Sequence, residues 1–409
     1  MSGRKATWRF AKWLFAVIVI ATGCFSAWLW YSSRKSQPLV VRSHVSVPLI
    51  EEHVDDITTC VLLFESQTPV LVSSDSHVRL YSPDDDEKLA ELPQLVNVGV
   101  APIPNGIMIG ENTFASDTVR ISPKSGTFLS VAGRRYRGTL LLVRSSEEKL
   151  IGINEVYIGD YVQSVVTAEM PWRWPMEALK AQAIAARTYA LWRSQQRRGR
   201  LFYLFADSRD QVYRGVGSES RRSRKATSLT RGVVLVENKR LLPAFFHSTC
   251  GGETESAELI FNIAGFASLK GVTCDYCSGS KFYRWHRRLA VKDVSDALAK
   301  LGYDFENVDS IKIERDVEFR EILVKGTRQD GSVAVCPVGA FRSTLGTLVI
   351  RTTFFEARRE GDDLIFEGRG WGHFVGMCQW GARKMAKEGH GAGEILEYYY
   401  PGSELAAAY

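Results

Sequence analysis

The sequence contains no repeat of fixed period and no segment of low complexity, which excludes a repeat architecture and a long biased tail. Charged residues make up 24% of the 409 residues, an ordinary share for a folded protein that argues against long disorder. Apolar residues reach 45% and aromatic residues 11%, enough to bury a sizeable core. We therefore expect a globular protein of two or three domains.

Nucleotide-binding signatures are also missing. In the glycine-rich segment 368–381, the glycines at 370, 372 and 376 do not match the G-x-G-x-x-G spacing, and the segment has no P-loop lysine. The net charge is +6, but the basic run Arg221–Lys225 is of a kind that usually lies in a solvated loop. We expect an anionic partner such as a cell-wall polymer or a lipid surface, and no nucleic acid.

The first 35 residues carry a membrane-targeting pattern. An uncharged stretch from Trp13 to Tyr31 is about one bilayer long as a helix. Four positive charges precede it and two follow it directly, which favours a cytoplasmic N-terminus and an exported remainder. The prediction is a single-pass signal anchor in the cytoplasmic membrane with an extracytoplasmic domain. A cleaved signal peptide and a lipoprotein processed at Cys24 are the alternatives.

The rest of the chain divides into three segments by pattern. Residues 36–55 are expected to be a linker. Residues 56–150 show short apolar runs separated by turn residues, which predicts strands. Residues 151–409 mix helical and strand patterns and are expected to form the core. Because helices and strands are segregated without regular βαβ alternation, the predicted fold class is α+β.

Glu169 ends a helix predicted over residues 156–169. Val162 and Val165 recur with it at helical spacing, so Glu169 lies on the apolar stripe of that helix. The segment 171–175, Pro-Trp-Arg-Trp-Pro, ends this helix, and a second helix follows. Burial and the negative end of the helix dipole both raise the pKa of a carboxyl group, and a protonated carboxylic acid can protonate a glycosidic oxygen. The alternative is a surface glutamate.

Two further groups of side chains could bind a substrate. Lys180 and Arg187 lie seven residues apart on one face of the second helix, where Lys180 could instead form an ordinary surface pair with Glu177. The segment around Trp371 combines glycines with aromatic rings that can stack on sugars. Its alternative is a tight, buried loop without a ligand.

A metal site is predicted by two pairs with two-residue spacers, His247-x-x-Cys250 and Cys274-x-x-Cys277. Together they supply the Cys₃His set of a closed, structural zinc site. A disulfide between two of these cysteines is the alternative, although it would leave a third cysteine unpaired in an oxidising compartment.

Several longer motifs occur in a recognisable order. They are GDYVQSVVTAEMPWRWPMEALKAQAIAARTYAL (159–191), DSRDQVYRGV (207–216), HSTCGGETE (247–255), GRGWGHFVGMCQWGA (368–382) and ILEYYYPGSEL (395–405). With these motifs the sequence resembles the SpoIID/LytB family, named for stage II sporulation protein D and an amidase enhancer. The resemblance implies a peptidoglycan lytic transglycosylase with a glycan-binding groove, acting on glycan strands already stripped of stem peptides by a cell-wall amidase. Some members bind zinc near the HST segment.

The resemblance also assigns roles to single residues. It places the catalytic glutamate at Glu169 and the family's lysine and arginine at Lys180 and Arg187. The other substrate-binding candidates in the matching motifs are Tyr213, Trp371, His373 and Gln379. The chain departs from the family pattern at Gly159, where an acidic residue is usual, and its HST and GMCQ segments carry cysteine where serine is frequent. In members without those cysteines the HST histidine could line the groove.

Three functions compete. In the first, Glu169 alone cleaves the bond between N-acetylmuramic acid and N-acetylglucosamine and closes a 1,6-anhydro ring; Asp160 and Asp207 would serve a hydrolase as second carboxylates. In the second, the protein is a non-catalytic glycan-binding scaffold that enhances an amidase. In the third, Cys378 and His373 form a hydrolase, which is disfavoured because both lie in one loop without an orienting third group.

Overall fold

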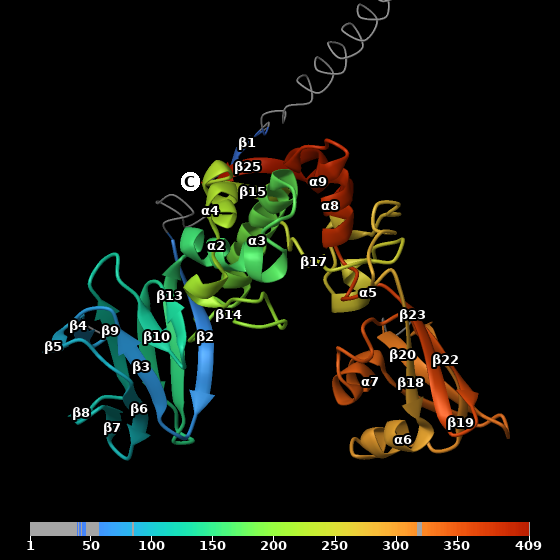
Figure 1. Ribbon diagram of the computed structural model, residues 1–409, viewed down its shortest axis with the longest axis horizontal. Coiled ribbons are helices and arrows are strands. Elements are labelled where there is room, and N and C mark those ends of the chain that lie inside the picture. The colour runs from blue at the N-terminus through green and yellow to red at the C-terminus, as the bar shows by residue number, and fades with distance from the viewer. Residues whose placement is uncertain are drawn as a thin grey trace, which may run out of the picture.

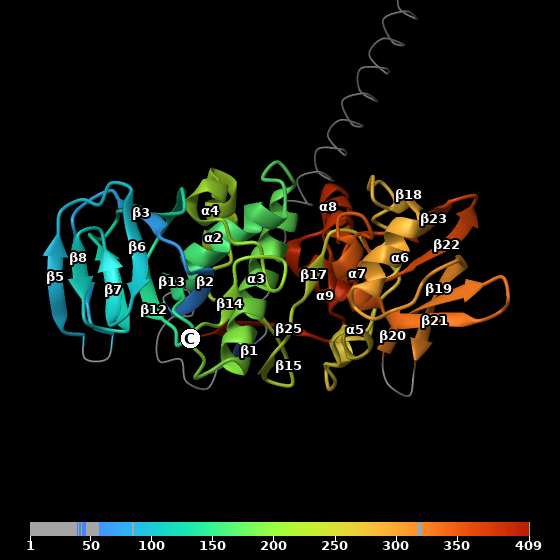
Figure 2. The same cartoon turned by 90° about the horizontal axis from the view of Figure 1, so that it is seen from below.

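The computed structural model describes residues 39, 41, 43–45, 57–83, 86–316 and 321–408. The predicted anchor, residues 1–35, lies outside this range. Among the described helices, none has both the length and the hydropathy needed to cross a membrane. The chain forms three parts in a row: a β-rich N-terminal part, a central helical part and an inserted mixed part (Figure 1, Figure 2). This mixture of helices and strands confirms the α+β fold class.

Two sheets that share one hydrophobic core build the N-terminal part. The seven-stranded sheet has the order β14-β2-β13-β12-β9-β4-β5, and the six-stranded sheet has the order β11-β10-β3-β6-β7-β8. The strands of the first sheet are β2 (Thr58–Ser66), β4 (Val78–Tyr81), β5 (Lys88–Leu92), β9 (Thr118–Pro123), β12 (Thr139–Arg144), β13 (Leu150–Tyr157) and β14 (Leu204–Phe205). Those of the second are β3 (Val70–Ser74), β6 (Val98–Ile103), β7 (Gly106–Ile109), β8 (Asn112–Phe114), β10 (Leu129–Val131) and β11 (Arg134–Tyr136).

The predicted strand pattern of the N-terminal part is the observed one. In β4, Val78 and Leu80 are buried while Arg79 between them is exposed, the alternation of a half-buried strand. β13 runs directly into the first helix of the central part, so that helix begins at Ile158 and not at Val156 as predicted.

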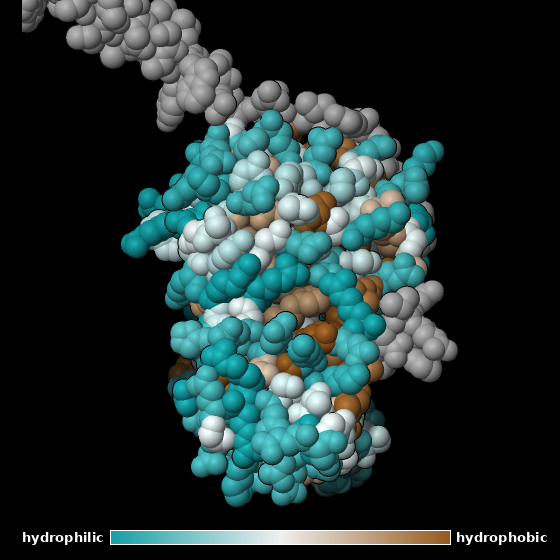
Figure 3. Space-filling view, turned by 90° about the vertical axis from the view of Figure 1, so that its right-hand side faces the viewer, coloured by the Kyte–Doolittle hydropathy of each residue, from teal (hydrophilic) through white to brown (hydrophobic). Residues whose placement is uncertain are grey.

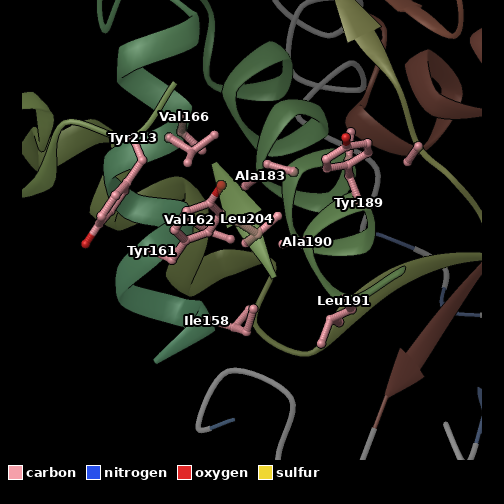
Figure 4. Close-up of a cluster of buried hydrophobic side chains, with 14 of the residues drawn as sticks. Ile158, Tyr161, Val162, Val166, Ala183, Tyr189, Ala190, Leu191, Leu204 and Tyr213 are labelled. Carbon is pink, nitrogen blue, oxygen red and sulfur yellow. The ribbon is translucent and has the colours of Figure 1, made fainter. Parts of the chain in front are cut away.

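The central part is organised around one long buried helix, α3 (Met176–Gln196). The other helices that pack on it are α2 (Ile158–Glu169), α4 (Arg221–Leu229), α8 (Gln379–Lys387) and α9 (Ala392–Tyr399). In Figure 4, Val162 and Val166 of α2 lie in the hydrophobic cluster together with Ala183 and Ala190 of α3. Small side chains on α3 let its neighbours approach closely, and this packing fixes the end of α2 where Glu169 lies.

A four-stranded sheet closes the central part with the order β1-β25-β15-β16. Its strands are β1 (Ser43–Val45), β15 (Val233–Glu237), β16 (Arg240–Leu241) and β25 (Glu404–Ala408). β1 belongs to the predicted linker 36–55, yet it pairs in parallel with β25 at the other end of the chain. The linker prediction is therefore wrong for these three residues, which tie the N-terminal segment to the core.

The sequence favours a solvated loop for the basic run Arg221–Lys225. In the structure this run forms the start of helix α4. Ser220 caps this helix through a reciprocal capping box with Ser223, which satisfies backbone amides at its start. Arg222 donates to the carbonyls of Trp172 and Trp174 at 2.9 and 2.8 Å. This arginine thus holds the elbow between α2 and α3.

The inserted part has a hydrophobic core of its own, separate from the core that the N-terminal and central parts share. Its sheet has the order β18-β23-β22-β19-β20-β21. Its elements are β18 (Arg284–Ala290), α6 (Val291–Ala299), β19 (Val308–Asp316), β20 (Glu321–Arg328), β21 (Val333–Pro337), α7 (Val338–Leu345), β22 (Phe355–Glu360) and β23 (Asp363–Arg369). Phe341, Phe355 and Phe366 pack in this core. Seen from the side of the inserted part, the surface of the molecule is mostly hydrophilic, with hydrophobic residues gathered near the middle (Figure 3).

Short elements connect the central and inserted parts. They are the 3₁₀ helix η3 (Ala267–Leu269), the helix α5 (Ala257–Phe261) and the strands β17 (Phe246–His247) and β24 (Met377–Cys378). The 3₁₀ helix η2 (Gly215–Ser218) packs instead on α2 and β11. β17 and β24 pair in parallel, which places His247 beside Cys378 in register. This pairing brings the HST motif against the glycine-rich motif.

Candidate functional site

Glu169 is the last residue of α2, and its carboxyl group is partly buried. One of its oxygens, Oε1, accepts a hydrogen bond of 2.7 Å from the backbone amide of Val212. The side chain of Gln379, the first residue of α8, also interacts with the carboxyl group and lowers its pKa. The carboxyl group is therefore contacted by groups from two segments that lie far from α2 in the sequence.

Burial raises the pKa of Glu169 to about 7. The Val212 amide, the positive charge of Arg214 and the Gln379 hydrogen bond act in the opposite direction, but desolvation is the largest effect. This is the direction expected from the apolar stripe of α2. A carboxylic acid with a pKa near 7 can give up and recover a proton close to neutral pH.

The amide of Val212 is held in place by its two neighbours in the chain. Gln211 is fully buried and bridges α2 to α3: it accepts from the hydroxyl of Tyr161 at 3.0 Å and donates to the carbonyl of Ala186 at 3.3 Å. Tyr213 is 1% exposed and donates from its hydroxyl to Asn154 at 2.7 Å. Tyr213 was predicted to bind substrate, but its buried position makes it an anchor for the segment that carries the Val212 amide.

Gln379 was also predicted to bind substrate. It is 4% exposed, and besides Glu169 it contacts Gln182 of α3, donating to the Gln182 side-chain oxygen at 3.3 Å. A side chain with so little exposed surface has little room to contact a ligand directly. Gln379 is therefore placed to orient the carboxyl group.

The predicted substrate-binding pair on α3 is placed differently from expectation. Lys180 forms the ordinary helix pair with Glu177, with Nζ 2.8 Å from the carboxylate. Arg187 is fully buried and donates to the backbone carbonyls of Val233 and Thr227. The prediction that Arg187 binds substrate is therefore not supported by its position, because its guanidinium group braces the packing of α3 against β15 and α4.

The glycine-rich loop around Trp371 is largely buried, as expected if it were a tight structural loop and not a ligand-binding one. A Cβ on Gly376, whose φ is +70°, would lie 2.1 Å from the carbonyl oxygen of Phe245, so the loop can press directly on the HST segment. Trp371 is partly buried and meets Phe282 edge to face at 4.4 Å. His373 accepts from the amide of Val375 at 3.1 Å, and burial lowers its pKa to about 3.

These placements exclude the Cys378–His373 hydrolase. The ring of His373 lies beside Phe245 and Phe261, while the sulfur of Cys378 is fully buried in a cluster of other cysteines. A nucleophilic cysteine needs a base within hydrogen-bonding reach, and His373 has other partners.

Asp160 and Asp207, the two alternative second carboxylates, each lie close to an arginine side chain. Asp207 is exposed and pairs with Arg209 at 2.7 Å, which lowers the pKa of the Asp207 carboxyl group. Asp160 lies 3.7 Å from Arg137 and lines a cavity of about 890 Å³ that Glu169 does not line. Neither carboxylate is among the groups that act on Glu169.

Four buried cysteines converge beside this site. The sulfur atoms of Cys250, Cys274, Cys277 and Cys378 all lie within 4.8 Å of one another, and the cysteines of the described chain carry free thiols. Four thiolates about 2.3 Å from a tetrahedral zinc ion would be roughly 3.8 Å apart, so this donor set fits zinc. His247, the fourth predicted ligand, is not in this cluster: its Nδ1 lies 3.2 Å from the carbonyl of Val375.

The described part of the chain thus combines an α+β fold with one partly buried carboxylic acid held by an amide and a carboxamide. Comparison with known proteins gives three informative relatives. Residues 146–236 match the family described as Stage II sporulation protein. An uncharacterized protein of Brachyspira hyodysenteriae is 30% identical over 349 residues, which is 84% of this chain and 92% of that protein. Stage II sporulation protein D of Bacillus amyloliquefaciens is 30% identical over 275 residues, 63% of this chain and 76% of that protein.

The third relative, the Amidase enhancer of Bacillus subtilis, is 26% identical over 339 residues, covering 71% of this chain and 47% of that protein. The chain therefore belongs to the stage II sporulation protein D family, as the sequence motifs indicated.

Proposed function

We propose that this protein is a peptidoglycan lytic transglycosylase in which Glu169 is the general acid and base. The observation that carries the proposal is the partly buried Glu169, whose pKa burial raises to about 7 and whose oxygen is fixed by the Val212 amide. The names of two relatives, Stage II sporulation protein D and Amidase enhancer, support a role at the cell wall.

The proposed reaction needs one proton-transferring group. Protonated Glu169 donates its proton to the oxygen that leaves from C1 of N-acetylmuramic acid, and the bond from C1 to the N-acetylglucosamine O4 breaks. The carboxylate then takes the proton of the C6 hydroxyl of the same muramic acid, whose oxygen bonds to C1. The products are a free O4 hydroxyl and a 1,6-anhydro ring, and no water is consumed. Proton transfer of this kind contributes about 10²–10⁴ in rate.

The surroundings of Glu169 support a single-carboxylate reaction. A hydrolase pairs an acid with a second carboxylate that acts as base or nucleophile. Asp160 and Asp207, the two alternatives, face Arg137 and Arg209, and the charge that acts on Glu169 is that of Arg214. The glycan groove around Glu169 remains a prediction.

Anchoring and partners belong to the same proposal. The uncharged stretch Trp13–Tyr31 would hold the protein in the cytoplasmic membrane with its folded part outside. A cell-wall amidase would prepare the stripped glycan strands. A reporter fused after Tyr409 should be active only outside the cytoplasm, whereas a mature chain that starts near Ser32 or at a lipidated Cys24 would refute the anchor.

We also propose a structural zinc ion at the cysteine cluster. Cys250, Cys274 and Cys277 would supply three of its thiolate ligands, and a closed four-ligand site contributes folding free energy and no chemistry on the substrate. The purified protein is expected to contain about one zinc per chain. Metal analysis that finds none, together with a disulfide between Cys274 and Cys277, would show the proposal to be wrong.

The alternative is a glycan-binding scaffold that enhances an amidase, which the name of the Bacillus subtilis relative favours. The deciding experiment incubates the full chain with amidase-stripped glycan and identifies the products by mass spectrometry. We expect ends with 1,6-anhydro-muramic acid from the wild type and none from Glu169→Gln, because glutamine cannot donate and recover the proton.

The controls separate the alternatives. Glu147→Gln, on an exposed carboxylate paired with Lys149, should cut at the wild-type rate. Products that end in reducing muramic acid would mean that water is the nucleophile, and Asp160→Asn and Asp207→Asn would then identify the second carboxylate. A wild type that binds stripped glycan without cutting it would establish the scaffold.

A further inference from the structure

The cysteine cluster is directly connected to Glu169 through the start of α8. Cys378 is the N-cap residue of α8. Gln379, the next residue, is buried against Gln182 of α3 and interacts with the carboxyl group of Glu169, whose pKa it lowers. Only one peptide bond separates a sulfur-bearing residue of the cluster from the side chain that orients the acid. The N-terminal end of α8 is therefore shared by the two sites.

Other contacts hold this end of α8 against the HST segment. The amide of Trp380 donates to the carbonyl of Ser248 at 3.1 Å, and the amide of Cys250 donates to the sulfur of Cys378 at 3.4 Å. Backbone amides that donate to sulfur are typical partners of a metal-bound thiolate, because they stabilise its negative charge. The sulfur of Cys378 thus has the surroundings of a ligand.

A second residue on the same face of α8 is also fitted to the cluster. Gly381 lies one turn into the helix, and a Cβ there would be 1.8 Å from the hydroxyl of Tyr399 and 3.1 Å from the sulfur of Cys274. The Tyr399 hydroxyl is itself 3.2 Å from that sulfur. Only glycine leaves room for Tyr399 and Cys274 to lie this close to α8. The helix therefore contacts the cluster through Cys378 at its start and through Gly381 in its first turn.

We propose that Cys378 is the fourth ligand of the zinc site, in place of His247, and that the metal locks α8 so that Gln379 holds Glu169 in its working orientation. Zinc would thus act as a positioning group for the acid, without touching the substrate. The catalytic consequence rests on the proposed role of Glu169, but the ligand set and the locking of α8 do not.

A bound zinc ion would hold the start of α8 mechanically. Four thiolates bound to one ion are fixed relative to each other, and Cys378 then fixes the first turn of α8 relative to Cys250, Cys274 and Cys277. Without the ion, four buried thiols have only weak hydrogen bonds, and the amide groups that point at them lose charged partners. The start of α8 should then open, and Gln379 should lose its place on Glu169.

The first test measures the ligand set in the full chain. Cys378→Ser should weaken zinc affinity by more than about 100-fold, because altered outer-shell partners alone cost about 10–100-fold. His247→Ala should keep about one zinc per chain. Cys336→Ser is the matched control, since Cys336 is 1% exposed in β21 and lies outside the cluster. Cobalt(II) substitution adds a spectroscopic count, as the sulfur-to-cobalt charge-transfer band weakens when one thiolate is lost.

The second test measures the locking of α8 in the wild-type chain. Hydrogen exchange is followed by mass spectrometry with zinc bound and after removal of zinc by a chelator. Removal should speed exchange in the peptide that covers residues 377–387 and in the peptide that contains Val212, while the inserted strands β19 to β21 stay unchanged. Re-addition of zinc should restore protection.

The outcomes are separable from those of the proposed function. Full zinc affinity in Cys378→Ser, or zinc loss in His247→Ala, overturns the ligand assignment. Unchanged exchange at residues 377–387 after zinc removal overturns the locking. If both measurements agree with the proposal but the loaded wild type cuts no glycan, the zinc-locked helix stands and the transglycosylase assignment fails.

Discussion

Replacing the acid should make the protein more stable, and increasingly so as the pH rises. The pKa of Glu169 is about 7 in the folded protein against an ordinary value of 4.5. The folded state therefore binds this proton more tightly than the unfolded state does. The resulting stability is fully present below pH 4.5 and is lost as the pH rises from 4.5 through about 7.

The size of the effect follows from that difference. At about 1.4 kcal/mol per pKa unit, the full loss above pH 7 is roughly 3 kcal/mol, and partial exposure of the carboxyl group reduces it to about 2–3 kcal/mol. Glu169→Gln removes the ionisation and keeps the shape. Glutamine can still accept from the Val212 amide, and any loss of the Gln379 contact is the same at every pH.

The assay is urea denaturation of both proteins at pH 5 and pH 8. The stability of Glu169→Gln relative to wild type should rise by about 2 kcal/mol between these values, because most of the ionisation of folded Glu169 lies between them. Asp207→Asn is the control: the pKa of Asp207 is lowered from 3.8, so its stabilising effect is present above that value and is lost only in more acidic solution. Its gap to wild type should not change between pH 5 and 8. A constant gap for Glu169→Gln would refute the buried-acid reasoning.

Three more results are expected. A pH–rate profile of glycan cleavage should fall about tenfold per pH unit above pH 7, because the acid must be protonated. Gln379→Ala should bind glycan but cut it slowly, and its profile should fall at a higher pH than wild type, since the Gln379 hydrogen bond lowers the pKa of Glu169; an unshifted profile would mean that the contact is absent in solution. Arg187→Lys should lower the free energy of unfolding by roughly 2–3 kcal/mol, because a charged group that serves two buried carbonyls loses one of them, and glycan affinity measured on the folded variant should be unchanged.

Sequence patterns predicted the acid because its signals are local. Glu169 shares helical spacing with Val162 and Val165, and the Pro-Trp-Arg-Trp-Pro segment marks the end of the helix within a few residues. Both features act over one or two turns of chain, and the structure has α2 ending at Glu169. The partner that fixes the carboxyl oxygen is the amide of Val212, and a backbone amide has no signature in the sequence.

The cysteine cluster, which we propose to bind zinc, shows the opposite case. The prediction rests on two pairs that are close in sequence, His247 with Cys250 and Cys274 with Cys277. Such pairs predict the full ligand set only when every ligand belongs to one of them. Cys378 lies about a hundred residues after Cys277, beyond a part of the chain with its own core, and reaches the cluster through the pairing of β17 with β24. Strand β1 could not be predicted for a similar reason, because it pairs with β25 at the other end of the chain.

A residue in a family motif can also be expected to contact the substrate when it is in fact buried behind the residues that could. Arg187 and Tyr213 lie in the motifs that match the family, yet both are buried and serve carbonyl or side-chain oxygens of the core. A sequence match does not distinguish a side chain that touches the ligand from one that holds the touching group. Burial decides between them, and it depends on the packing of α3 against segments that the motif does not contain.

The energetics of Glu169 bear on the choice between enzyme and scaffold. A protein that only binds glycan gains nothing from a carboxyl group that destabilises the fold by about 2–3 kcal/mol above pH 7, because glutamine would fill the same space without ionising. A general acid requires that desolvation, since the desolvation keeps the proton available near neutral pH. The surrounding contacts converge on the carboxyl group: Gln211 and Tyr213 hold the segment whose amide donates to it, and Gln379 reaches it from α8. An arrangement that orients a single costly acid from two distant segments supports catalysis over scaffolding.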